Sequence, residues 1–408
     1  MLHNGRTPPS GPSFGGCNGL VPGSTRRYRH LVAFSFRRVR PAELTPGEIE
    51  RWRGMQQGND ALRSPYYCPE FSLIVGEQRP DAAVTVIEEA GRVVGFFPFQ
   101  AGRLGLGHPI GGILSDHHGV ITEAGVVVDI RRLLRASRLR RWTFLELDTT
   151  QPGLDRYARG SATSPLVDLS DGFDDYVAHQ GTQTDFFRRT FAKQRRLERA
   201  VGPVRFEART TSHDVLDQLR TWKSAQYIAS GFYDLLAEPW VIGLTDAVAT
   251  AEAPGFRGML SALYVGDELI AAHLGMASSS VWHYWLPSYS LDYSRYSPGT
   301  ILLASMIRHA PTIGLHELDL GTGEDPYKDR VANDAVELVS GSAEPTVAHR
   351  TVGRIADRTI EALRRSQSVR GVVRRARDAV GHRPNSAITP GAGRRRRRGG
   401  ATRSPRHD

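Results

Sequence analysis

Cysteine and lysine are both scarce in this sequence. Only two of its 408 residues are cysteine, Cys17 and Cys68, and only three are lysine, against 50 arginines. Neither cysteine belongs to a CxxC pair, which argues against a structural zinc site and a disulfide framework. No run approaches the ~20 apolar residues of a membrane-spanning helix, and the first 30 residues lack the apolar core of a signal peptide. These absences predict a soluble, cytoplasmic protein.

The net charge of +10 comes from the C-terminal end alone. Residues 366–408 hold twelve Arg and two Asp, and the remaining residues carry 41 basic and 41 acidic side chains. The globular part therefore lacks the general positive charge of a protein with a large nucleic-acid footprint. We interpret the tail as a disordered Arg-rich arm, which either touches anionic surfaces nonspecifically or has no dedicated partner.

The three lysines are Lys193, Lys223 and Lys328. In a chain that uses Arg almost everywhere, a remaining Lys indicates a place that needs a compact ammonium group rather than a planar guanidinium. Chance survival is the alternative explanation.

Helix-like and strand-like segments are interspersed along the chain, which predicts an α/β fold with a mixed sheet. In the first half we expect a helix from Thr45-Pro46, strands at 72–75, 83–89, 92–100 and 142–147, and a helix near 126–138. In the second half we expect helices at 182–201, 212–229 and 238–253, strands at 204–210 and 281–290, and a hairpin over 257–278. Both halves share the order hairpin, strand, helix, strand, which indicates two tandem units.

The predicted organisation has five parts. They are a disordered leader at 1–30, a first unit at 31–165, a second unit at 166–345, a terminal helix at 346–382 and a disordered tail at 383–408.

Residues 291–330 carry the clearest candidate for a binding site. Ser297-Pro298-Gly299-Thr300 predicts the start of a helix, where free N–H groups and the positive end of the dipole suit an anion. The alternative is an ordinary capped helix. Asp319 ends a short strand before a Gly-Thr-Gly loop, and it either faces a cleft or caps that turn.

Four segments of the second half, taken together, resemble the CelD/BcsL-type acetyltransferase domain of the GNAT superfamily. They are residues 186–202, 262–276, 284–310 and 315–331, and their order and spacing both agree. The first half resembles the degenerate first unit of the same proteins. Tandem units of this kind also occur in Fem-type aminoacyltransferases, which use charged tRNA.

The resemblance implies acyl transfer, usually from acetyl-CoA as co-substrate, by direct attack of an amine or hydroxyl on the thioester. The CoA diphosphate is then expected at the helix start formed here by Arg295, Ser297, Gly299 and Thr300. The sequence departs at this point from the usual Gln/Arg-x-x-Gly-x-Gly/Ala loop of the superfamily.

Direct acyl transfer needs a base for the proton of the acceptor and hydrogen-bond donors for the developing oxyanion. The predicted catalytic residues are Asp319, His283 and Glu324, with a buried structural role as the alternative for His283. Tyr327 and Lys328 are predicted to bind substrate, with a surface ion pair as the alternative for Lys328.

The helix at 186–202 is strongly basic, and its Arg189 and Lys193 are further candidates for substrate binding. The helix either holds an anionic acceptor, the 3′-phosphate of CoA or tRNA, or is a solvated charged face. His117 and His118 are adjacent and have no spaced partner set, so no metal site is predicted.

The sequence therefore predicts a GNAT-type N- or O-acetyltransferase with acyl-CoA and a small polar or saccharide acceptor as partners and no specific nucleic acid. The resemblance adds a link to polysaccharide or cell-envelope synthesis. Two alternatives stay open: a Fem-like aminoacyltransferase that uses charged tRNA, and a non-catalytic GNAT scaffold that binds a partner.

Overall fold

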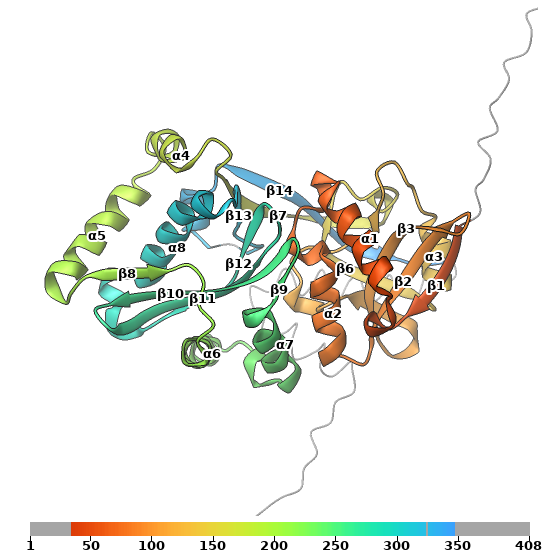
Figure 1. Ribbon diagram of the computed structural model, residues 1–408, viewed down its shortest axis with the longest axis horizontal. Helices are drawn as coiled ribbons and strands as arrows, with labels where there is room; N and C mark the ends of the chain where they lie inside the picture. Colours follow the sequence, from red (N-terminus) through yellow and green to blue (C-terminus); the bar gives the residue numbers. More distant parts are fainter. Residues whose placement is uncertain (1–33, 324, 347–408) are drawn as a thin grey trace, which may run out of the picture. The chain divides into compact units, whose positions relative to one another are not determined.

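One continuous sheet organises the chain in the computed structural model, which describes residues 34–323 and 325–346 (Figure 1). Its main strand order is β1-β2-β3-β4-β6-β14-β7-β13-β12-β11-β10-β8, with β5 beside β3 and β9 beside β10. Neighbouring strands are antiparallel, except that β4 and β6 are parallel, as are β12 and β13. The predicted mixed α/β fold is therefore confirmed, with a large and mostly antiparallel sheet.

The strands are β1 Phe34–Val39, β2 Ala82–Glu89, β3 Arg92–Ala101, β4 Leu106–Pro109, β5 Ile121–Thr122, β6 Arg141–Asp148, β7 Ala158–Asp168, β8 Val204–Glu207, β9 Glu252–Ala253, β10 Phe256–Val265, β11 Glu268–Ala277, β12 Val281–Tyr289, β13 Glu317–Asp319 and β14 Asp334–Ala343. The α-helices are α1 Pro46–Gln57, α2 Pro69–Gln78, α3 Ile130–Ala136, α4 Phe173–Gln180, α5 Phe186–Ala200, α6 His213–Ala229, α7 Pro239–Thr250 and α8 Pro298–His309.

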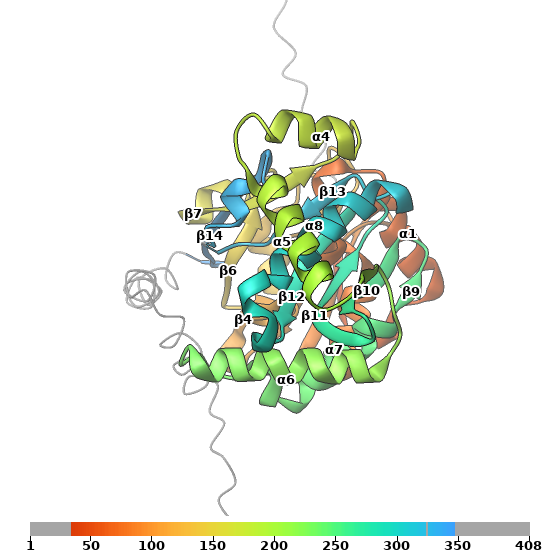
Figure 2. The ribbon, with the colours of Figure 1, turned by 90° about the vertical axis from the view of Figure 1, so that its left-hand side faces the viewer.

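Helices cover both faces of the sheet in the second half. Side chains of β10 alternate between the two faces, as the period of two in a strand requires. Met259 and Leu263 pack in the core that contains α8, whereas Leu260 packs in the core that contains α6 and α7. Helix α5 lies across α8 on the outside of the first core (Figure 2).

The two halves of the chain share strands. Strand β14, from the end of the described chain, pairs with β6 of the first half and with β7. The predicted boundary between residues 165 and 166 falls inside β7, and the unit boundaries stay a prediction. The predicted leader, terminal helix and Arg-rich tail lie almost wholly outside the described residues.

Most predicted elements are present, with ends that differ by a few residues. The segment 72–75, predicted as a strand, instead lies in α2. Pro69 at the first turn favours a helix there, and Phe71 and Val75, four residues apart, are both fully buried on one side of it. The prediction missed β1, β4, β5, β7, β9, β14 and α4.

Candidate active site

Strand β12 forms the frame of the candidate site. It pairs with β13 only from Val281 to His283, because β13 ends at Asp319 while β12 continues to Tyr289. Helix α8 starts beyond the far end of β12, and a Cβ atom added to Gly299 would lie 3.1 Å from the Tyr289 ring. Polar groups gather at both ends of this strand.

The start of α8 forms the first group, which we call the helix-start cluster and define as Lys193, Arg196, Arg295, Ser297 and Gly299. Lys193 Nζ donates a 2.8 Å hydrogen bond to Ser297 Oγ, so α5 brings its lysine to the helix start. The guanidinium groups of Arg295 and Arg196 lie over the Tyr296 ring, 4.7 and 5.9 Å from its centroid. Two predicted segments, the basic helix and the Ser-Pro-Gly turn, thus meet.

A second helix with the same Pro-Gly start shows what is special about α8. Helix α1 starts Pro46-Gly47, and the Thr45 and Glu48 side chains form a capping box around its first turn. Within the described residues, no side chain caps α8 at Ser297, whose φ of 56° is left-handed. Pro298 has no N–H, and the Thr300 N–H already donates to the Ser297 carbonyl at 3.0 Å. Among the described residues the Gly299 N–H has no such partner, so it is left for an anion, beside a lysine and two arginines.

The other two residues predicted near this cluster make contacts of their own. The Thr300 hydroxyl donates to the Ser297 carbonyl at 2.8 Å, so it serves the first turn of the helix. Arg189 lies on the outer side of α5, 69% exposed, and forms an ion pair with Asp185 at 2.5 Å.

The opposite end of β12 carries the second group, the histidine–aspartate network, made of Asp116, His117, Ser164, His283 and Asp319. His117 Nε2 and Ser164 Oγ lie 2.6 and 2.5 Å from the two oxygens of Asp319. His283 Nδ1 is 3.3 Å from Asp319 Oδ2, and its Nε2 is 3.0 Å from Asp116 Oδ2. The structure thus brings the predicted residues Asp319 and His283 together.

Opposite charges dominate the electrostatics of this network. Burial alone would lower the pKa of His283, but the carboxylates of Asp319 and Asp116 outweigh it and raise that pKa to about 9. Burial would likewise raise the pKa of Asp319, yet His117 and His283 hold it well below its usual value. His283 is therefore an imidazolium between two carboxylates at neutral pH.

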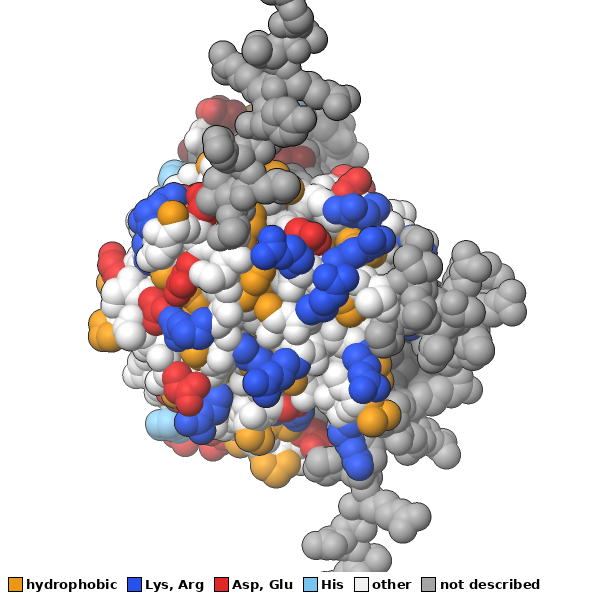
Figure 3. All heavy atoms as spheres, turned by 90° about the vertical axis from the view of Figure 1, so that its right-hand side faces the viewer, with side chains coloured by type: hydrophobic (Ala, Val, Ile, Leu, Met, Phe, Trp, Pro, Cys, Tyr) orange, Lys and Arg blue, Asp and Glu red, His pale blue; other side chains and the backbone are white. Residues whose placement is uncertain are grey.

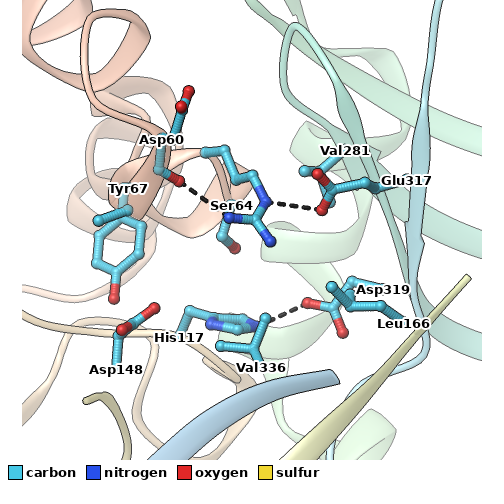
Figure 4. Close-up of a pocket in the computed structure, with 12 residues that line it drawn as sticks. Asp60, Ser64, Tyr67, His117, Asp148, Leu166, Val281, Glu317, Asp319 and Val336 are labelled. Atoms are coloured by element: carbon cyan, nitrogen blue, oxygen red, sulfur yellow. Dashed lines mark hydrogen bonds and ion pairs between the residues drawn. The ribbon is translucent and has the colours of Figure 1, made fainter. Parts of the chain in front are cut away.

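Asp116 is the most exposed member of this network. A cavity of about 20 Å³ borders His117 and Asp319 (Figure 4), which leaves room for about one water molecule and none for a substrate. Asp319 and His283 are essentially buried, whereas the Asp116 side chain is 23% exposed. Gly321 lies against Asp116, since an added Cβ would be 2.8 Å from its Oδ2.

The loop after β13 holds the remaining predicted residues. Lys328 is buried, and its Nζ donates to the carbonyls of Gly321 and Thr322 at 3.0 and 3.1 Å. Its neighbour Tyr327 is partly buried, which raises the pKa of its phenol. Glu324 lies outside the described residues.

Lys223 of α6 lies close to this loop. It donates to the Pro287 carbonyl of β12 at 3.1 Å. Burial lowers its pKa to about 8, with Asp325 opposing this effect and Lys328 adding to it. Each of the three lysines in the sequence therefore contacts β12, α8 or the loop after β13.

The sequence analysis did not identify Asp116 or Ser164 as members of the network. It considered His117 only as a possible metal ligand. The signal that contained two of them is Ser-Asp-His-His at 115–118. The second histidine, His118, is structural. Its Nε2 accepts hydrogen bonds from the backbone of Leu145 and Glu146, and burial next to His117 lowers its pKa to about 3.

The two groups are separated by the length of β12. Six residues from His283 to Tyr289 span about 20 Å at 3.3 Å per residue. Within the described part of the chain, no three His, Cys, Asp or Glu side chains are grouped in a way that could hold a metal ion.

Comparison with known protein families places this geometry in context. Residues 185–329 match the model of a family described as an acetyltransferase (GNAT) domain. This segment of the second half is therefore similar to a GNAT acetyltransferase domain. The matched segment includes α5, β12, α8 and the loop with Lys328, whereas Asp116, His117 and Ser164 come from outside it. No curated protein matched the sequence.

Solved structures resemble the chain across both halves. FemX is 10% identical, with a TM-score of 0.52 over 78% of this chain and 99% of its own, and at this identity the similarity concerns the fold. A C-terminal domain of a putative lysylphosphatidylglycerol synthetase from Agrobacterium fabrum is 15% identical, with a TM-score of 0.49 over 75% and 94%. A tandem GNAT protein from the clavulanic acid pathway is 11% identical, with a TM-score of 0.44 over 77% and 99%.

Proposed function

We propose that the protein transfers an acetyl or similar acyl group from acyl-CoA to an amine or hydroxyl. The observation that carries this proposal is the pair of polar groups at the two ends of β12. The helix-start cluster offers the Gly299 N–H and the cations Lys193, Arg196 and Arg295 for the CoA diphosphate. The pantetheine arm then follows β12 and delivers the thioester to the histidine–aspartate network.

In this proposal Asp116 receives the acceptor. Its carboxylate is the exposed end of the network, so it can bind an incoming amine or hydroxyl and accept the proton at an Oδ atom during attack on the thioester. The buried His283 imidazolium donates a hydrogen bond to Asp116 and fixes the orientation of its carboxylate. Asp319, held by His117 and Ser164, in turn fixes His283.

The proposed acceptor is a small polar molecule or a sugar, and the residues predicted to bind it are Tyr327 and Lys328. Support for a saccharide comes from the resemblance to CelD/BcsL-type acetyltransferases, which also suggests a role in polysaccharide or cell-envelope synthesis. We place the reaction in the cytoplasm because acyl-CoA is a cytoplasmic donor. No helix in the described part of the chain is long and apolar enough to cross a membrane.

A second candidate is an aminoacyltransferase that takes its acyl group from charged tRNA. The observation in its favour is helix α5, where Arg188 and Arg189 are exposed close to Lys193. Arginines on a helix suit phosphate groups, and FemX has the same fold. The globular part is formally neutral, whereas tRNA binding usually needs many cations, so the charge favours acyl-CoA as the donor.

Isothermal titration with acetyl-CoA, CoA and charged tRNA separates these candidates. We expect acetyl-CoA to bind, and Gly299→Asp to weaken this binding by at least about 10-fold, because it adds a negative charge where the diphosphate docks. Gly299→Asn is the matched control, since it adds the same bulk beside the Tyr289 ring without the negative charge. If the protein binds charged tRNA but does not bind acetyl-CoA, the proposal is overturned. If it binds CoA but acetylates no amine or sugar, it is a non-catalytic scaffold.

A further inference from the structure

A basic surface on the first half of the chain takes no part in the proposed reaction. It is formed by seven exposed arginines on β1, α3, the turn before β4 and the loop after α3, which we call the α3 arginine surface. They are Arg38, Arg103, Arg131, Arg132, Arg135, Arg138 and Arg140. Figure 3 views the side of the molecule that carries β1 and α3, and Lys and Arg side chains are spread across it.

Hydrogen bonds join these elements into one surface. Arg132 donates to the Phe34 carbonyl at 3.4 Å and Arg38 to the Ser137 carbonyl at 3.3 Å, which ties β1 to α3. The Arg140 N–H donates to the Gly105 carbonyl at 2.8 Å, which brings in the turn before β4. Helix α3 buries Leu133 and Leu134 and presents its arginines to solvent.

The positive charge of this surface is not neutralised within the fold. Among the described residues, no ion pair joins any of the seven arginines to a carboxylate. Asp129 is used as the N-cap of α3, where it accepts from two backbone N–H groups. Partial burial and the neighbouring Arg138 lower the pKa of Arg38, which shows that like charges have been placed together.

Two leucines protrude among these arginines. Leu104 is 80% exposed and Leu106 is 45% exposed. Leu104 also has a φ of 60°, a left-handed conformation that is uncommon for a residue other than glycine. The turn therefore holds an apolar side chain in solvent, directly beside Arg103.

The last described residues lie at the same surface. Arg135 donates to the Pro345 carbonyl at 3.0 Å, and the described chain ends one residue later. The following sequence includes residues 366–408, with their net charge of +10.

We infer that the α3 arginine surface is a docking site for an anionic lipid bilayer, with Leu104 and Leu106 inserting among the headgroups. Clustered arginines are attracted to the negative surface of a membrane, and protruding apolar side chains add burial in the interface. A nucleic acid would use the arginines but offers phosphate and solvent to Leu104, so it fits the surface less well. This docking would hold the protein against the bilayer.

Vesicle sedimentation with the full chain tests this inference. We expect binding to phosphatidylcholine vesicles that contain phosphatidylglycerol and little binding to phosphatidylcholine alone. Changing Arg131, Arg132 and Arg138 together to Gln should weaken binding by about 100-fold, since each arginine at such a surface contributes roughly 5-fold. Changing Leu104 and Leu106 to Ser should weaken it by about 10-fold.

The controls separate the folded surface from the tail and from charge alone. Arg205, Arg257 and Arg308, changed together to Gln, remove the same charge from the second half and should leave binding within about 2-fold. Changing Arg394 to Arg398 to Gln tests the tail. The inference is overturned if the Arg394–Arg398 variant no longer binds vesicles while the Arg131/Arg132/Arg138 variant still does. It is also overturned if the leucine variant binds vesicles as well as the unchanged protein and RNA displaces the protein from vesicles as well as free lipid vesicles do.

Discussion

The helix-start cluster and the histidine–aspartate network differ in how the chain builds them. Three of the five members of the cluster, Arg295, Ser297 and Gly299, lie within five residues of sequence, and the other two come from α5; its cations sit on exposed side chains. The network joins side chains from positions 116–117, 164, 283 and 319, almost all of them buried. Water and salt weaken the electrostatics of the cluster, whereas burial strengthens those of the network. The cluster is therefore suited to binding and the network to holding a proton in place.

The largest effect is expected from Asp116→Asn, which leaves the network in place and removes the proposed proton acceptor. We expect kcat to fall by about 10²- to 10⁴-fold, because this is the usual contribution of a general base, while the Kd for acetyl-CoA stays unchanged. Steady-state kinetics and calorimetry measure the two quantities. Asp171→Asn, at an exposed aspartate outside the site, is the control. Equal losses of kcat and affinity would show that the network and the cluster are not separate.

A smaller effect on stability is expected from the charge of His283. Its folded pKa of about 9 lies above the usual 6.5. A group whose pKa is raised by folding stabilises the fold fully below its unfolded pKa and loses this contribution as the pH rises through its folded pKa. The free energy of unfolding should therefore decrease from about pH 6.5 to about pH 9.

His283→Gln should remove that pH dependence and cost about 3 kcal/mol at neutral pH, because it leaves the buried carboxylate of Asp319 with one cation fewer. Urea denaturation at several pH values measures both. If the variant keeps the same slope between pH 6.5 and pH 9, the slope belongs to another group.

Features formed by neighbouring residues can be predicted from the sequence, whereas contacts between residues far apart in the sequence cannot. Ser-Pro-Gly at a helix start is a local pattern, and Gly266-Asp267 places a hairpin that the structure confirms. The position of Lys193 beside Ser297 depends on how α5 crosses α8, and no short pattern carries that information. The adjacency of Asp116 to His283, 167 residues apart, depends on strand sharing between the halves. For this reason the Ser-Asp-His-His segment looked like a weak metal motif in the sequence.

The smallest effects are expected from substitutions in α5, which test whether the acetyl-CoA site extends along this helix. Lys193→Ala should raise the Kd for acetyl-CoA by about 10-fold, because a charge-assisted contact at the helix start is lost. Lys193→Arg should recover part of this affinity, since it restores the charge without the compact geometry of the ammonium. Arg189→Gln should change the Kd by less than about 2-fold, because its guanidinium is exposed and paired with Asp185. An equal loss for Arg189→Gln and Lys193→Ala would extend the binding site over the outer face of α5, where charged tRNA would then be the better candidate donor.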